Sequence, residues 1–239
     1  MIEGFKNMTL NDEDFELPST ADIAYYQTFR EAGRELNNEL IKELPKSAYK
    51  ECGKKLGIWQ GNTLIFGREE EADVFFDFCL HQFRINKTNV IERHLALNPP
   101  PSDSIELAIL QSLCQSHYSV FVIKEVFKNK GVIALDLLYA KEFFIIDIGL
   151  SVSGVEGLIF ATHIRPFLNK FHVSSGATLP VPPVFAKDDK LASIIIKFIP
   201  ENSGDLLSKN KEALFASQVI RTVLKAYAQD ESRGWGYLE

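Results

Sequence analysis

Cysteine is scarce in this chain, and it also lacks long apolar runs and an excess of basic charge. Its 239 residues include three cysteines, too few and too irregularly placed for a disulfide framework. No apolar run reaches the roughly 18 residues that span a bilayer. The first 18 residues are acidic and contain no apolar signal-peptide segment. The net charge of −6 argues against a general nucleic-acid binder, whose surface is basic. We therefore expect a soluble, cytoplasmic protein with no membrane partner.

Standard catalytic and cofactor motifs are also missing. GKKLG at 53–57 has the wrong residue order for a P-loop, and no G-x-G-x-x-G occurs. GLSVSG at 149–154 does not match the nucleophile elbow G-x-S-x-G. We therefore expect no cofactor and no standard mononucleotide site.

The first half of the chain has helical periodicity and recognisable helix ends. Ser19 is a good N-cap, and Asp22 follows at the spacing of a capping box. Pro45 should end the helix that they begin, and Gly57 should end a second helix over about 47–56. The segment IWQGNTLIFG that follows predicts two short extended pieces around a turn.

Three more helices are expected before residue 117. Acidic residues 69–71 favour a helix N-terminus through the macrodipole, and this helix should continue to about 83. A second should cover 88–97, and a third should run from a cap at Ser102 or Asp103 to about 115.

From residue 118 the pattern changes from helical to extended. Five runs rich in β-branched and aromatic residues have turn signals between them; they span 118–131, 132–141, 142–151, 157–170 and 171–181. Five short antiparallel strands suggest a curled sheet or a small barrel. Beyond them, apolar residues between 191 and 199 have helical spacing, with a strand as the alternative, and a last helix should cover about 205–229.

These elements predict an α+β protein with a mainly helical N-terminal half, a five-stranded antiparallel sheet or SH3-like small barrel, and C-terminal helices. The expected regions are a flexible tail, a helical region, a β region, and the C-terminal helices with a tail; they cover 1–18, 19–116, 117–182 and 183–239. Short connections would let these regions form one unit.

The β region resembles an uncharacterised bacterial protein family. The shared features are a Tyr-Ser-Leu-Phe-like start, an Asp-Leu-Leu step, an Asp-x-Gly-Leu-Ser-like turn and a late Ser-Gly. They correspond to YSVFVIKEV, IALDLLYAK, IIDIGLS and HVSSGA, and the earlier GNTLIFGREEEADVFFDF also fits. The resemblance covers about residues 47–180. No activity is known for the family, so the resemblance implies a helical-then-β organisation and no site residue.

Cysteines and histidines in CLHQFRINKTNVIERH, residues 79–94, raise the question of a metal site. Helix positions two residues apart point about 200° apart, so one ion could not easily bind both Cys79 and His81. Cys79 and His94 fall on apolar faces, whereas His81 shares a polar face with Asp77. The stretch therefore reads as two core-facing helices and a turn.

A second group, CQSH, places Cys114 and His117 at i, i+3 spacing. These two are the candidate metal ligands, but they lack the two further partners that zinc normally needs. Free cysteine is also among the most buried residue types, so a core position is the alternative. We therefore expect no metal.

Four polar residues on the β runs are the candidate catalytic residues. His163 and Arg165 alternate along ATHIRP and so share one face of a strand. If Asp136 or Asp147 lay opposite, the group could bind an anionic ligand or transfer protons. Alternatively, these side chains form the solvated face of a half-buried sheet, or the aspartates accept hydrogen bonds from turn amides.

Without a complete catalytic constellation, the leading hypothesis is a non-enzymatic binding or protein-interaction module. An enzyme that uses the Asp, His and Arg candidates is the second hypothesis. Nucleic-acid binding is the third: Tyr118, Phe121 and Phe127 lie near Lys124 and neighbouring lysines. Nearby glutamates dilute that positive charge, so nucleic acid is not the expected partner.

Overall fold

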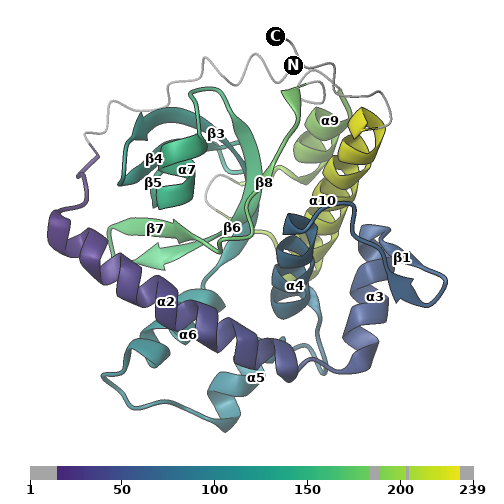
Figure 1. Ribbon diagram of the computed structural model, residues 1–239, viewed down its shortest axis with the longest axis horizontal. Helices are drawn as coiled ribbons and strands as arrows, with labels where there is room; N and C mark the ends of the chain where they lie inside the picture. The colour runs from purple at the N-terminus through teal and green to yellow at the C-terminus, as the bar shows by residue number, and fades with distance from the viewer. Residues whose placement is uncertain (1–14, 184–188, 203–204, 232–239) are drawn as a thin grey trace.

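The computed structural model describes residues 15–183, 189–202 and 205–231. Figure 1 shows a small β-barrel flanked by helices, with α2 running along one side of it. Most of the expected N-terminal tail and the last eight residues lie outside the described residues. The helices before the barrel are α2 (Thr20–Lys42), α3 (Lys46–Leu56), α4 (Glu70–Gln82), α5 (Val90–Leu97) and α6 (Ile105–Cys114). The predicted mainly helical first half is thereby confirmed.

Local sequence signals set the helix ends. The Ser19 hydroxyl accepts a hydrogen bond from the Asp22 amide at 3.2 Å, and the Asp22 carboxylate accepts one from the Ser19 amide at 2.8 Å. Gly57 ends α3 with a left-handed φ of 79°. The expected cap of α6 was wrong: Ser104 accepts the capping bond from Leu107 at 3.1 Å. Three adjacent residues in PSDSIE are all good caps, and their order alone does not select one.

Two short strands, β1 (Trp59–Gln60) and β2 (Thr63–Leu64), form the hairpin that was expected between α3 and α4. After the barrel come α9 (Asp189–Phe198) and α10 (Lys209–Glu231). The helix interpretation of residues 191–199 is therefore correct, and the strand alternative is wrong. Among the described residues, no helix combines the length and the apolar character that crossing a membrane requires.

Five strands close into a barrel, which confirms the α+β class with a small barrel. They are β3 (His117–Phe127), β4 (Gly131–Asp136), β5 (Lys141–Ile146), β6 (Ile159–Phe167) and β7 (Phe171–Ser174). Their order is β3-β4-β5-β7-β6, and antiparallel pairing of β3 with β6 closes the ring. A two-residue strand, β8 (Leu179–Pro180), extends β6 at its edge.

The barrel is mixed, so the prediction of a purely antiparallel sheet was wrong. β5 and β7 run parallel, with Ile145 opposite His172. The run expected to be a strand over 142–151 ends early in the short helix α7 (Ile148–Ser153). Asp147 starts this helix, because its Oδ1 accepts a hydrogen bond from the Leu150 amide at 2.9 Å. α7 and β6 then separate β5 from β7 along the chain, which allows β7 to return in the same direction.

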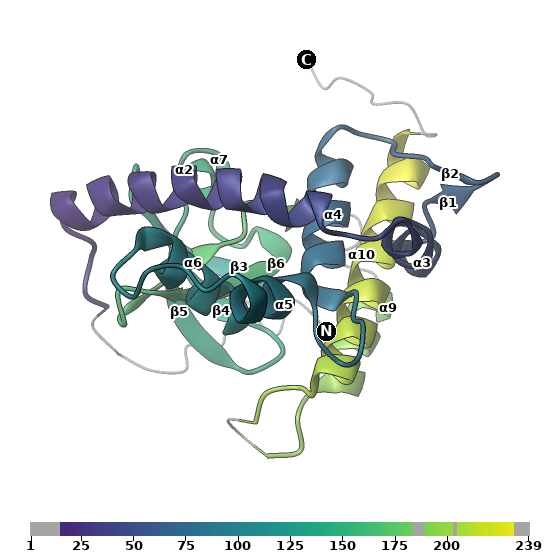
Figure 2. The same ribbon diagram turned by 90° about the horizontal axis from the view of Figure 1, so that it is seen from below.

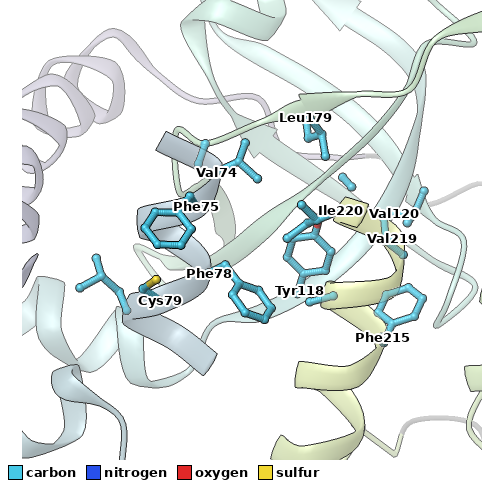
Figure 3. Close-up of a cluster of buried hydrophobic side chains, with 14 of the residues drawn as sticks. Val74, Phe75, Phe78, Cys79, Tyr118, Val120, Leu179, Phe215, Val219 and Ile220 are labelled. Carbon is cyan, nitrogen blue, oxygen red and sulfur yellow. The ribbon is translucent and has the colours of Figure 1, made fainter. Parts of the chain in front are cut away.

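Alternation along the strands produces two cores. Residues that point into the barrel form one apolar cluster, which includes Phe121, Val132, Ile145, Phe160 and Ile164. Residues that point outward join the helices in a larger core. Figure 3 shows part of this larger core, where Phe78 of α4, Tyr118 of β3 and Phe215 of α10 meet.

Figure 2 shows how the helices are arranged around the barrel. α2 lies across the barrel and extends toward α4, while α4, α10 and α9 stand together beside it. In this arrangement the outer face of β6 is turned toward helices α2 and α4.

Candidate functional site

His163 and Arg165 share the outer face of β6, as their alternation predicts. They are 1% and 5% exposed, so they do not lie on a solvated face of the sheet. The Nδ1 atom of His163 lies 2.5 Å from Oδ2 of Asp77 on α4. The guanidinium of Arg165 lies 5.2 Å from the centre of the Phe29 ring on α2. Both side chains therefore connect the barrel with its helices.

Asp136 lies on the opposite face of the sheet from His163 and Arg165. It is fully buried and pairs in register with Phe121, which belongs to the barrel interior. Its Oδ1 atom accepts three hydrogen bonds: from Ser119 Oγ at 2.5 Å, from the Leu138 amide at 2.8 Å and from the Tyr139 amide at 3.1 Å. Asp136 thus accepts hydrogen bonds from turn amides, which was the alternative considered for it.

Asp147 is likewise separated from the β6 pair. One of its carboxylate oxygens caps α7, and the other accepts a hydrogen bond from the hydroxyl of Ser174. The structure therefore does not bring Asp136 or Asp147 together with His163 and Arg165. The carboxylate beside His163 is Asp77, a residue 86 positions away in the sequence.

Buried hydrogen bonds indicate which ring nitrogen of His163 carries the proton when no metal is bound. Its Nε2 lies 3.1 Å from Nε2 of Gln82, whose amide also donates to Oε1 of Glu212 at 3.2 Å. An amide nitrogen only donates, so Nε2 of His163 accepts and its proton resides on Nδ1. That proton is shared with Asp77. Burial opposes ionisation of Asp77, but His163 holds the pKa of Asp77 below its usual value.

His81 stacks on His163 with ring centres 4.1 Å apart. Its Nδ1 lies 3.0 Å from Oγ of Ser116, and that hydroxyl donates to the carbonyl of Leu113 at 2.8 Å. His81 Nδ1 must therefore donate, and its Nε2 carries a lone pair that faces Oδ1 of Asp77 at 3.8 Å. Burial, together with the neighbouring His163, lowers the pKa of His81 well below its usual value, so the ring is neutral.

A cavity of about 610 Å³ opens beside Asp77. A polar stripe of α2 forms one wall; its residues are Arg30, Gly33, Arg34, Asn37 and Asn38. Arg165, Ser175 and Gly176 form the opposite wall. A second cavity of about 580 Å³ shares Arg30, Arg34 and Gly176 with the first. We call these two cavities together the arginine cleft.

Arg165 is the most unusual residue of the arginine cleft. Its Nε and Nη1 atoms are buried and have no hydrogen-bond partner among the described residues. Burial and the nearby Arg30 lower the pKa of Arg165 to about 10, so it remains a cation at neutral pH. Arg30 itself rests against Gly176, where an added Cβ would lie 2.7 Å from its Nη2. Two cations thus converge on one end of the cavity.

Some of these residues could have been identified from the sequence. Arg30, Arg34 and Asn37 recur at the spacing of one helix face in FREAGRELNNEL, a signal that the sequence analysis passed over. The polar helix face of His81 and Asp77 was identified. In the structure this polar face is turned inward, and His81 is 4% exposed. The buried positions predicted for Cys79 and His94 are confirmed.

The candidate metal ligands Cys114 and His117 do not belong to a ligand cluster among the described residues. Cys114 ends α6, while His117 begins β3 with its Nε2 3.5 Å from Oδ2 of Asp136. Within the described ranges, the three side chains close enough to share an ion are Asp77, His81 and His163, whose ligand atoms lie within 4.8 Å of one another.

The aromatics considered for nucleic-acid stacking are largely core residues. Tyr118 and Phe121 are 2% and 0% exposed, and Phe127 is half-buried against the main core. Stacking of bases on these rings would require them to be at the surface. Nucleic-acid binding itself stays an untested prediction.

The fold and the site together define an α+β protein with a small closed barrel and an arginine-lined cleft between barrel and helices. The chain belongs to a family of unknown function, DUF7986, whose model matches residues 20–211. This range includes the resemblance expected over 47–180 and confirms that the family is uncharacterised. No curated protein and no solved structure matched the chain.

Proposed function

We propose that this protein binds a small molecule with a carboxylate or phosphate group in the arginine cleft. The observation that carries the proposal is Arg165, a buried cation whose Nε and Nη1 have no hydrogen-bond partner among the described residues. Burying a charge without a partner is costly, and a guanidinium offers parallel donors that match a carboxylate or phosphate. Because these two atoms are covered by protein in the structure, an anion in the cavity would supply their missing acceptors after the guanidinium turns toward it.

The neighbouring side chains support the same ligand. Arg30 and Arg34 line both cavities, whose walls also carry the carboxylates of Glu31, Asp73, Asp77 and Asp147. The positive charge is therefore local to the end of the first cavity where Arg30 lies near Arg165. Mutual repulsion between Arg30 and Arg165 would be relieved by an anion placed between them. Asn37 and Ser175 add uncharged hydrogen-bonding groups to the wall.

The geometry favours binding over acid–base catalysis. His163, the imidazole once considered as a catalyst, directs Nε2 toward Gln82 and Glu212 and not toward the cavity. Neither Gln82 nor Glu212 lines the first cavity. We therefore propose that the chain is a binding protein. We also propose a cytoplasmic location, which its three free cysteines support.

Calorimetry and thermal denaturation with inorganic phosphate and with malonate would test this proposal. Arg30→Gln and Arg165→Gln should each weaken binding at least about tenfold, or ~1.4 kcal/mol. Lys128→Gln, which removes a charge from the exposed β3–β4 turn, should bind like the wild type. Chloride at matched ionic strength controls for screening.

Arg165→Gln also separates a ligand-binding arginine from a structural one. Without ligand, this variant should be at least as stable as the wild type, because the substitution removes an unpaired buried charge. Equal anion affinity in wild type and Arg165→Gln would refute the proposal, as would failure of the wild type to bind either anion.

A further inference from the structure

Asp77, His81 and His163 together have the donor set of a transition-metal centre. Asp77 and His81 are four residues apart on α4, so both side chains leave the same helix face, and His163 reaches them from β6. Two imidazoles and one carboxylate form a ligand set that suits ions such as Zn²⁺, Mn²⁺ and Fe²⁺. Of these three residues, the sequence analysis considered only His81 for a metal, and only together with Cys79.

The lone pairs around Asp77 are arranged for a cation. His81 Nε2 and Asp77 Oδ1 are both hydrogen-bond acceptors, and they face each other across 3.8 Å. Typical metal–ligand bonds of about 2.0–2.2 Å place tetrahedral ligand atoms roughly 3.4 Å apart. To bind an ion, His81 would move closer to Asp77, and the 2.5 Å contact between His163 and Asp77 would lengthen as the metal replaces its shared proton. Asp77 also lines the cavity, which leaves room for water or another ligand on the open side.

His81 has the outer partner that a metal-bound histidine usually has. His81 Nδ1 donates to Ser116, whose hydroxyl is itself held by the Leu113 carbonyl. Behind His163, the carboxylate oxygen Oε1 of Glu212 lies 3.8 Å from Nε2. The contact with Ser116 would hold the His81 ring in place, and Glu212 would add a negative charge near the His163 ring.

Gln82 contacts the ring nitrogen of His163 that would not bind the metal. Its Oε1 atom is buried and has no hydrogen-bond partner among the described residues. Rotation of the amide by half a turn would place Oε1 beside Nε2 of His163 as an acceptor, and it would give up the hydrogen bond that the amide donates to Glu212. A metal at Nδ1 of His163 requires the ring proton to move to Nε2, and the rotated amide would accept it there. The proton stays on the ring, so its charge is unchanged.

From these contacts we infer that Asp77, His81 and His163 bind a divalent transition-metal ion at the wall of the arginine cleft. The metal site is distinct from the anion site at Arg165, because its ligands are Asp77 and His81 of α4 and His163 of β6. Metal binding can therefore be measured with no anionic ligand present.

The test uses the untagged full chain, which is dialysed with Zn²⁺ in chloride buffer and then against metal-free buffer. Mass spectrometry measures the metal that is retained, and calorimetry measures its affinity. The wild type should retain a stoichiometric amount of zinc. Asp77→Asn and His81→Gln should bind at least about tenfold more weakly. His94→Gln is the matched control, because His94 also pairs with a carboxylate, Glu43 at 2.7 Å, but lies outside the trio. Arg165→Gln should keep its zinc, which separates this site from anion binding.

Circular dichroism would show whether each variant is folded. If a ligand variant does not fold, Co²⁺ bound to the wild type gives a separate readout by NMR. Paramagnetically shifted ring protons from His81 and His163 would support the site. Four results would each overturn the inference. The first two are no retained metal in the wild type and loss of zinc in Cys114→Ser. The other two are zinc kept in folded Asp77→Asn and His81→Gln, and Co²⁺ shifts confined to other histidines.

Discussion

Replacement of Asp136 tests whether this residue supports the barrel or performs chemistry. Asp136→Ala removes the acceptor for Ser119 and for two amides of the β4–β5 turn. Asp136→Asn keeps one carbonyl oxygen, Oδ1, in nearly the same position. If Asp136 has a structural role, the two variants should differ strongly in stability. If it has a catalytic role that requires the charge, their stabilities should not differ.

The expected size follows from the three hydrogen bonds. An orphaned buried donor costs about 1–3 kcal/mol. The Tyr139 amide belongs to a half-buried residue and can reach water, so its loss counts for less. Ser119 and the Leu138 amide are buried and carry most of the cost. We therefore expect Asp136→Ala to lower the free energy of unfolding by about 3–5 kcal/mol, and Asp136→Asn by about 1–2 kcal/mol.

Urea denaturation followed by tryptophan fluorescence and circular dichroism would measure both values. Phosphate affinity of the folded variants should equal that of the wild type, because Asp136 faces away from the arginine cleft. An Asp136→Ala protein within about 1 kcal/mol of wild-type stability would refute this reasoning. Equal destabilisation by Ala and Asn would do so as well.

Gly176 and His172 give two further predictions, and Gly61 serves as the control for the first. Gly176→Ala should cost about 1–2 kcal/mol of stability and weaken phosphate binding, because Gly176 has a φ of 91° and its added Cβ would displace Arg30. Gly61→Ala, at φ 53° with nothing within 4 Å, should show a backbone cost but unchanged binding by calorimetry. Burial, followed by the neighbouring His117 and Lys141, lowers the pKa of His172 from 6.5 to about 4. This folded-state pKa is depressed, so its stabilisation is present above pH 6.5 and lost as the pH falls toward 4, by roughly 3 kcal/mol. His172→Gln should flatten that part of the stability curve in urea titrations; an unchanged slope would contradict the assignment.

The parts of the fold that the sequence predicted depend on short-range interactions. The Ser19–Asp22 capping box, the left-handed Gly57 and the helical spacing of residues 191–199 each involve neighbours within one or two turns. Such signals act within a few residues, so a sequence read by itself contains them. The choice of Ser104 over its neighbours as a cap is the exception, because three equivalent side chains compete there.

The parts that could not be predicted depend on distant partners. The parallel pairing of β5 with β7 follows from α7, a short helix inside an apolar run that looks like a strand. Helical phase placed His81 and Asp77 on one face of α4. It could not show that β6 would cover that face and bring His163 to it. For the same reason the carboxylate partner of His163 was sought on neighbouring strands and lies on a helix.

The two faces of β6 also have a consequence for folding. Phe160 and Ile164 point into the barrel, while His163 and Arg165 point out toward the helices. A slip of one residue in the pairing of β6 with β3 would exchange these faces. An imidazole and a guanidinium would then enter an apolar interior without their partners, at a cost of several kcal/mol. The polar pair therefore selects one register for the strand that closes the barrel, and a sequence with apolar residues at both positions would lose that discrimination.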